Sequence, residues 1–246
     1  MMIEKKRFMG DKSLRSYVIP MGTKEIGDWA FAGCRELAWI KIPASVTSVG
    51  RDAFAGCDKL MHASWYQERL EEEDELSGLM AVALRFFKAD ERLITERRTG
   101  WQAWMALWDE LCKTYLESSD AEGFRPFLAG GEEDYADEEE KLKEHCRATR
   151  LRKAFAVYVR LTADGNPERK AYYQKKLREN DVALDLLINH PENPAKAVGI
   201  FGEAGLLTQE NCQKLLKRLP EECVELKALI LQRAAQAGMG FSMDYI

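Results

Sequence analysis

The sequence lacks a long apolar run. No stretch of its 246 residues approaches the roughly 18 to 20 apolar residues that cross a bilayer. The first ten residues, MMIEKKRFMG, carry basic side chains, but no apolar segment of the kind found in secretory signal peptides follows them. We therefore expect no membrane-spanning segment, no membrane partner and a cytoplasmic location.

The usual signatures of catalytic and metal sites are also missing. The sequence contains no H-E-x-x-H, G-x-S-x-G or C-x-x-C motif, and it has only 3 histidines. The segments MGDKS and GMGFSM each hold a fragment of a glycine-rich nucleotide-binding motif, but neither has the required spacing or flanking elements. We therefore expect a protein without enzymatic activity, cofactor or metal ion.

Cysteine and charge patterns exclude further classes. The 6 cysteines, at positions 34, 57, 112, 146, 212 and 223, form no closely spaced pair, so a disulfide framework and a zinc site both explain them poorly. The formal net charge is −5, and basic residues are interspersed with acidic ones rather than gathered in a stripe. Because nucleic-acid binding needs a concentrated basic surface, we expect no nucleic-acid partner.

What the sequence does contain is an internal repeat near its N-terminus. A constant period of this kind is typical of solenoids, in which each small unit buries its apolar face against the next. At a fixed offset of 23 residues, one set of positions recurs as a second: Leu14, Ile19, Pro20, Ile26, Gly27, Ala30, Phe31, Ala32, Gly33 and Cys34 recur as Leu37, Ile42, Pro43, Val49, Gly50, Ala53, Phe54, Ala55, Gly56 and Cys57.

The second unit can be interpreted position by position. Leu37, Ile40 and Ile42 alternate along a strand and point into a core, so the residues between them point outward. Gly50 permits a tight turn, and Phe54 is expected to fill the centre of its layer. Cys34 and Cys57 occupy the same point of successive units and are interpreted as small buried apolar residues.

These residues carry a family resemblance. The pattern L-x-x-I-x-I-P-x-S-V-T-S-V-G-x-x-A-F-x-G-C, from Leu37 to Cys57, resembles the BspA-like leucine-rich repeats of bacterial proteins. The resemblance covers about residues 8–65; the first unit departs from it at Met21–Lys24, and the third ends after Leu60. It implies a right-handed solenoid of about two and a half units that serves in protein or surface recognition, without catalysis.

The outward face of the strands is the candidate binding site. Three strands near Tyr17, Ile40 and Met61 span only about 10 Å, so the face is small. An exposed tryptophan among polar neighbours favours protein binding. Alternatively, the first helix after the repeat covers this face, and Trp39 belongs to an internal interface. In register, the face offers one row of Ser16, Trp39 and His62 beside a second row of Val18, Lys41 and Ser64.

After Trp65 the sequence changes to helical periodicity. Residues 101–115 place tryptophans and other apolar side chains in one stripe, which indicates the buried face of an amphipathic helix. The acidic run GEEDYADEEE lacks the ligand order of a calcium loop and is interpreted as a connection followed by a helix N-terminus. A long helix is expected over 142–161, and shorter ones follow at 168–179, 181–189, 194–204, 209–218 and 221–237, separated by loops of a few residues.

The sequence thus predicts an α+β protein. Residues 1–66 form a short leucine-rich repeat solenoid, and residues 67–246 form a larger all-α array of antiparallel helix pairs, with a possible sub-boundary near 129–135. The segments ALDLLINH and AVGIFGEAGLLT in the helical part faintly resemble ankyrin helices, without the T-P-L-H signature.

The preferred function is a non-enzymatic protein-protein interaction or scaffold protein, whose protein partner is unknown. The alternative is a small-ligand receptor or an enzyme with a pocket at the junction of the repeat and the helical domain, to which Glu133, Asp134 and Asp137 contribute. A third interpretation is that the repeats only cap the helices, since terminal repeats protect an exposed core. The sequence leaves these three open.

Overall fold

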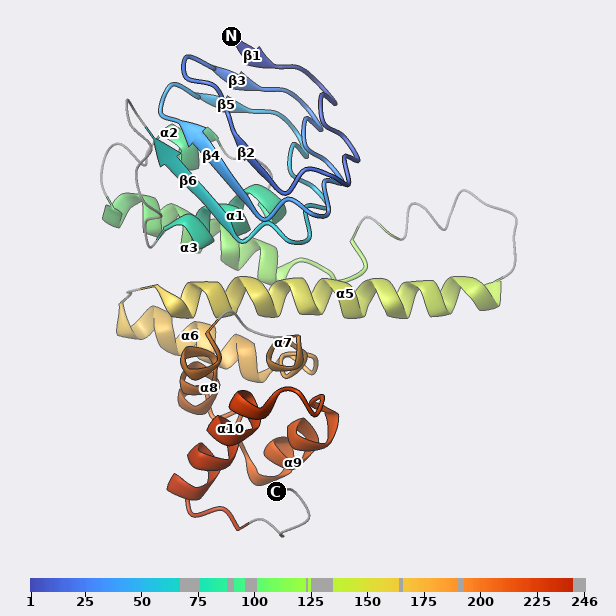
Figure 1. The fold of residues 1–246 in the computed structure, drawn as a ribbon, viewed down its shortest axis with the longest axis vertical. Coiled ribbons are helices and arrows are strands. Elements are labelled where there is room, and N and C mark those ends of the chain that lie inside the picture. The colour runs from blue at the N-terminus through green and yellow to red at the C-terminus, as the bar shows by residue number, and fades with distance from the viewer. Residues whose placement is uncertain are drawn as a thin grey trace. The chain divides into compact units, whose positions relative to one another are not determined.

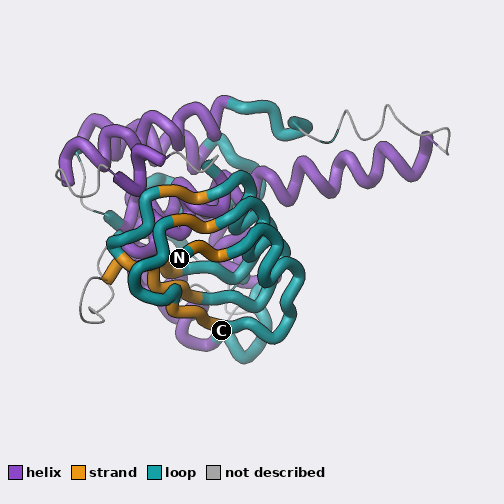
Figure 2. Tube along the Cα trace, turned by 90° about the horizontal axis from the view of Figure 1, so that it is seen from above, coloured by secondary structure: helices purple, strands orange, loops and turns teal. Residues whose placement is uncertain are grey.

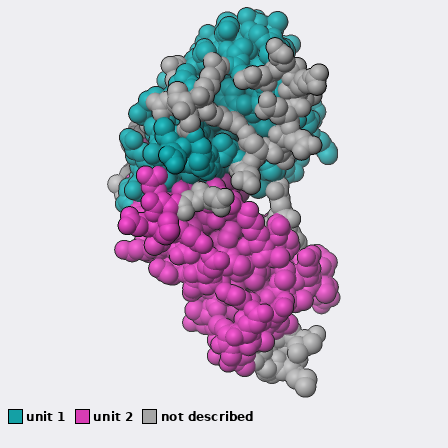
Figure 3. Space-filling model, turned by 90° about the vertical axis from the view of Figure 1, so that its left-hand side faces the viewer, with its two compact units in different colours: residues 1–118 teal, residues 119–246 magenta. Residues whose placement is uncertain are grey.

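We describe the protein from a computed structural model of residues 1–246. The structure describes residues 1–66, 76–87, 91–95, 101–122, 124, 135–163, 166–189 and 193–240. The chain divides into two compact units, Met1–Ser118 and Ser119–Ile246, which Figure 3 shows in separate colours. These units follow spatial contacts, whereas the predicted boundary after residue 66 marks the end of the repeat and stays a prediction. The predicted sub-boundary near 129–135 lies, apart from residue 135, outside the described residues.

The repeat segment of the first unit forms two parallel sheets (Figures 1 and 2). Each strand pairs with the strand one repeat later, so that residues 23 positions apart are partners, which is the register that the repeat predicts. One sheet has the order β1 (Met2–Ile3), β3 (Glu25–Ile26), β5 (Ser48–Val49). The other has the order β2 (Ser16–Val18), β4 (Trp39–Pro43), β6 (His62–Tyr66).

A stack of phenylalanine rings forms the centre of this unit's core. Phe8, Phe31 and Phe54 come from successive repeats, and their ring centroids lie 5.0 and 5.1 Å apart along the stack. Phe31 and Phe54 are fully buried. On β4, Ile40 and Ile42 are fully buried as well, so the predicted inward positions are confirmed.

Gly50 has a different role from the one expected. Its φ is not in the left-handed region; left-handed glycines occur instead at Gly33 and Gly56, with φ of +74° and +71°. A Cβ atom on Gly50 would lie 2.4 Å from the backbone nitrogen of Asp28 in the preceding repeat. Gly50 therefore permits the close approach of two chain segments rather than a tight turn.

Helices complete the first unit. These are α1 (Ser77–Phe86), α2 (Glu91–Thr95) and α3 (Trp101–Glu117). Helix α1 lies against β6, and α2 contacts both α3 and β5. Trp104 and Trp108 of α3 are buried, and their indole nitrogens donate hydrogen bonds to the carbonyl oxygens of Leu93 (2.7 Å) and Leu79 (2.8 Å). The tryptophan stripe is core at these two positions, as predicted, whereas Trp101 remains 40% exposed.

The second unit is helical in its described residues. Figure 1 shows α6 running back along α5, with which it makes extensive contact, and α10 packs on α8. The side chains of Asn166, Asn193 and Thr208 cap α6, α8 and α9 by accepting backbone N–H groups of the first turn. The helices are α5 (Tyr135–Thr162), α6 (Pro167–Arg178), α7 (Asp185–Ile188), α8 (Pro194–Glu203), α9 (Gln209–Arg218) and α10 (Val224–Gln236).

Two aspartates connect α5 to neighbouring segments of the same unit. Asp120 accepts hydrogen bonds from Arg150 (3.0 Å) and Lys153 (2.7 Å) of α5. Asp185, at the start of α7, accepts from Arg147 of α5 (2.8 Å) and from Arg218 of α9 (2.7 Å). Burial opposes the ionisation of both carboxyl groups, but these hydrogen bonds outweigh it and hold the pKa of each below its ordinary value.

Candidate functional site

The strand face is built by the sheet β2–β4–β6. Its two rows are in register as expected, because Ser16 pairs with Trp39 and Trp39 with His62, while Val18, Lys41 and Ser64 form the second row. The structure therefore brings all six predicted residues together on one sheet.

The exposure of this face falls from β2 to β6. Ser16 is exposed and Val18 is 39% exposed, Trp39 and Lys41 are half-buried, and Ser64 is only 4% exposed. A partner would thus meet the face at β2 and β4. Whether these residues bind a partner stays a prediction.

Helix α1 accounts for the shielded side of the face. The imidazole Nδ1 of His62 and the hydroxyl of Ser77, at the start of α1, are hydrogen-bonded at 3.2 Å. Arg85 near the other end of α1 donates to the carbonyl oxygens of Leu60 (3.1 Å) and Asp58 (2.9 Å) in the last repeat. The helix after the repeat therefore lies against β6, as the alternative interpretation expects, while Trp39 on β4 keeps part of its surface exposed.

A second aromatic position, Trp29, was not predicted from the sequence as a candidate site. Its indole is half-buried, and its φ of +55° is left-handed. Three cations surround the ring: Lys5 Nζ lies 4.8 Å, Lys6 Nζ 5.6 Å and the Arg51 guanidinium carbon 4.8 Å from the ring centroid. The repeat itself points to this residue, because the equivalent positions one unit before and after hold Lys6 and a polar aspartate.

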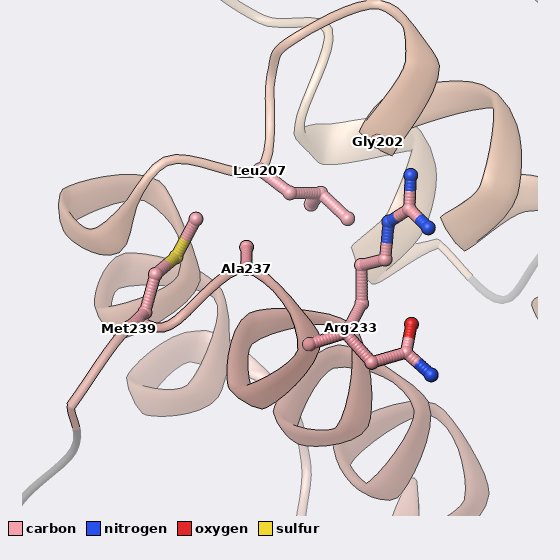
Figure 4. A pocket seen from close by; sticks show the side chains of 6 residues that line it. Gly202, Leu207, Arg233, Ala237 and Met239 are labelled. Atoms are coloured by element: carbon pink, nitrogen blue, oxygen red, sulfur yellow. The ribbon is translucent and has the colours of Figure 1, made fainter.

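The second unit contains a shallow pocket between the ends of α8 and α10 and the adjoining loops (Figure 4). Its volume is about 370 Å³. The Arg233 guanidinium packs so closely on Gly202 that a Cβ atom there would lie 2.7 Å from its Nε. The pocket is lined by Gly202, Leu207, Arg233, Gln236, Ala237 and Met239, and Arg233 is the one ionisable side chain among these described residues.

The acidic side chains that the alternative hypothesis places in a pocket are not among those that the structure describes. Glu133, Asp134 and the side chain of Asp137 lie outside the described residues, and the hypothesis of a pocket at the junction stays a prediction. In the part of the chain that the structure describes, no group of histidine, cysteine and acidic side chains is arranged to hold a metal ion.

Comparison with known proteins identifies the first part of the chain. Residues 1–73 match the family described as the BspA type leucine rich repeat region. This segment is therefore a leucine-rich repeat region of the BspA type, as the sequence pattern indicated. Repeats of this kind are typically modules for protein interaction rather than enzymes.

The remaining comparisons add no relative. No curated protein and no solved structure matches the chain, and the ankyrin-like resemblance of the helical part finds no support. Across the described ranges, none of the helices combines the length and the apolar character needed to span a bilayer.

Proposed function

We propose that this chain is a non-enzymatic interaction or scaffold protein whose leucine-rich repeat region contacts another protein. In this proposal residues 1–66 form a short right-handed solenoid, and the helical remainder is an array of antiparallel pairs that supplies further binding surface. The observation that carries the proposal is the match of the N-terminal segment to a repeat family that generally serves protein interaction.

The contact is proposed at the open side of the strand face. Val18 on β2 and the indole of Trp39 on β4 provide apolar surface, and Ser16 and Lys41 provide polar groups beside it. Such an arrangement, an aromatic anchor with a polar surround, is typical of interface hot spots.

The size of the face limits its contribution. Three strands at about 4.8 Å spacing span about 10 Å, and the longer strands have 5 residues, so the face covers roughly 200 Å², well below the roughly 800 Å² that each partner buries in a stable interface. The strand face is therefore proposed as an anchor, and a partner needs additional surface elsewhere on the chain. This requirement is what favours a scaffold over an isolated binding module.

Photo-crosslinking tests the location of the contact. A photoreactive phenylalanine analogue at Val18 should capture a specific partner, whereas the same analogue at the exposed Lys59, outside the face, should not. Equal capture from both positions, or none from Val18, would contradict the proposed face.

Affinity measurements with the purified captured protein test the anchor. Trp39→Ala should weaken binding by about tenfold or more, because truncated hot-spot tryptophans commonly cost 2 kcal/mol or above, roughly. Trp101→Ala is the matched control, since Trp101 is also partly exposed and lies on α3. If the two variants bind equally well, Trp39 is not the anchor.

A further inference from the structure

The cluster around Trp29 is a second candidate site, separate from the strand face. Lys5 and Lys6 precede the first unit, Trp29 lies in the first and Arg51 in the second, so the cluster crosses three successive segments of the chain. Its cations are exposed, and within the ranges that the structure describes they form no salt bridge.

The acidic side chains that share these repeat positions form no salt bridge with the three cations in the described part of the chain. Asp28 lies between Lys5 and Arg51 in the column of equivalent positions, but its Oδ1 accepts the backbone N–H of Arg51 at 2.9 Å. Asp52 lies in the column of Trp29 and makes no salt bridge with the three cations. The three cations outnumber these two carboxylates, so an additional anion would be attracted to the cluster.

The backbone of Trp29 is left-handed because the repeat is left-handed at this point, since the equivalent Lys6 and Asp52 have φ of +59° and +54°. A non-glycine residue in the left-handed region is uncommon, and for a bulky side chain it costs on the order of 1–3 kcal/mol. Asparagine or glycine would adopt φ of +55° more readily. The case for binding therefore rests on the indole and its three cations, while the left-handed backbone is common to the repeat turns.

We propose that Trp29, Lys5, Lys6 and Arg51 bind an extended acidic segment of a partner protein. Carboxylates would pair with the lysine ammonium groups and with the Arg51 guanidinium, which can hold a carboxylate by two hydrogen bonds. The aliphatic part of the segment would pack on the exposed part of the indole.

The spacing of the cations favours a peptide over a single small anion. Lys5 and Arg51 are two repeats apart, which separates their backbones by about 10 Å. Side chains on the same side of an extended segment recur about every 7 Å, so successive acidic residues can reach different cations of the cluster. An extended acidic segment carries several carboxylates and can pair with all three cations, whereas one phosphate brings a single compact charge.

The test uses the full chain and a fluorescein-labelled peptide of alternating glutamate and alanine, with binding followed by fluorescence anisotropy at low salt. Arg51→Glu should weaken binding by about tenfold or more, because it replaces an attraction with a repulsion. The matched control is Lys12→Glu, an equal charge change at an exposed residue that also precedes the first unit, which should weaken binding less than about twofold. Equal losses of peptide affinity in the two variants would show that the peptide is held by general electrostatic attraction, and would overturn the proposed site.

A second variant separates binding from folding. Asparagine suits the left-handed backbone, so the Trp29→Asn variant should keep the circular dichroism spectrum of the wild type. Its affinity for the peptide should fall by about tenfold or more. Unchanged peptide binding would mean that the cluster only stabilises the repeat. Displacement of the peptide by an equal concentration of inorganic phosphate would overturn the preference for an extended acidic segment. Trp39→Asp should leave peptide binding unchanged, since it alters the strand face alone.

Discussion

The thiol of Cys57 donates a hydrogen bond to the backbone carbonyl oxygen of Phe31, with 3.2 Å between sulfur and oxygen. One repeat earlier, Cys34 makes the same contact with Phe8 at 2.9 Å. The cysteines therefore fill a small buried space and also give a carbonyl of the neighbouring repeat a second hydrogen bond, beside the backbone N–H that it already accepts. This second role explains why cysteine occurs at this point in both repeats, where alanine would fill the space alone.

Cys57 should resist thiol reagents in the folded protein. Burial raises the pKa of its thiol to about 12, so almost no thiolate is present at neutral pH. Titration with a chromogenic disulfide reagent should show slow reaction at Cys57 and faster reaction at the half-buried Cys146, compared in the variants Cys57→Ala and Cys146→Ala. Rapid reaction of the Cys57 thiol in the native protein would contradict its burial in the repeat.

The repeat was the part of the fold most open to prediction, because its period determines which residues become neighbours. An offset of 23 residues places Trp39 opposite Ser16 and Phe54 above Phe31, whatever the details of the loops. The thiol contacts join residues 26 positions apart and depend on backbone direction, so periodicity does not reveal them. The left-handed backbone of Trp29 follows the period, since Lys6 and Asp52 share it, but no glycine or asparagine at these positions marks it in the sequence.

Gly50 and Gly199 should respond to alanine in opposite directions. A Cβ atom on Gly50 would lie 2.4 Å from a backbone nitrogen, so Gly50→Ala should lower the free energy of unfolding by about 1–3 kcal/mol. Gly199, inside α8, has nothing within 4 Å of that position, so Gly199→Ala should raise it by about 0.5–1 kcal/mol. Urea titrations measure both, and a destabilised Gly199→Ala would contradict the packing of α8.

Helix boundaries in the second unit were predicted unevenly. The predicted cap at Thr208 is confirmed, because its side chain accepts the N–H of Asn211. The helix expected over 181–189 was too long: residues 181–184 form turns, and Asn180 accepts the N–H of Val182. Local side-chain hydrogen bonds of this kind compete with a helix, and periodicity does not register them.

Ion pairs between residues far apart in the chain cannot be predicted from the sequence pattern. The pairing of Asp120 with Arg150 and Lys153 joins charges 30 or more positions apart, in a chain where acidic and basic residues are common throughout. Only the fold selects these partners. The candidate strand face was predictable because it follows the period, whereas its graded exposure depends on where α1 lies.

Asp185 should make stability depend on acid pH. Its pKa is lowered in the folded protein, so its contribution is present above the unfolded value of about 3.9 and is lost as pH falls through the folded value. Asp185→Asn should lower the free energy of unfolding by about 1 kcal/mol at neutral pH. The effect is modest because both guanidinium partners are largely exposed. Urea titrations at neutral pH and below pH of about 4 should show the difference from wild type shrinking.

The control for Asp185 is an exposed pair on α5. Glu139 Oε1 and Lys143 Nζ lie 2.8 Å apart on the helix surface, where solvent screens the pair. Glu139→Gln should therefore cause no measurable change in the free energy of unfolding at neutral pH. If Asp185→Asn and Glu139→Gln behave alike, the two hydrogen bonds to Asp185 do not stabilise the second unit.

Trp108 should anchor α3 to α1 through its indole N–H as well as its bulk. The side chain is fully buried, and Nε1 donates to the Leu79 carbonyl oxygen at 2.8 Å. Trp108→Phe removes this donor and leaves a small cavity, so it should lower the free energy of unfolding by about 2 kcal/mol. Trp101→Phe, on the exposed start of the same helix, should change it by less than about 0.5 kcal/mol. Urea titration of both variants provides the measurement, and equal effects would show that the tryptophan stripe is not anchored at Trp108.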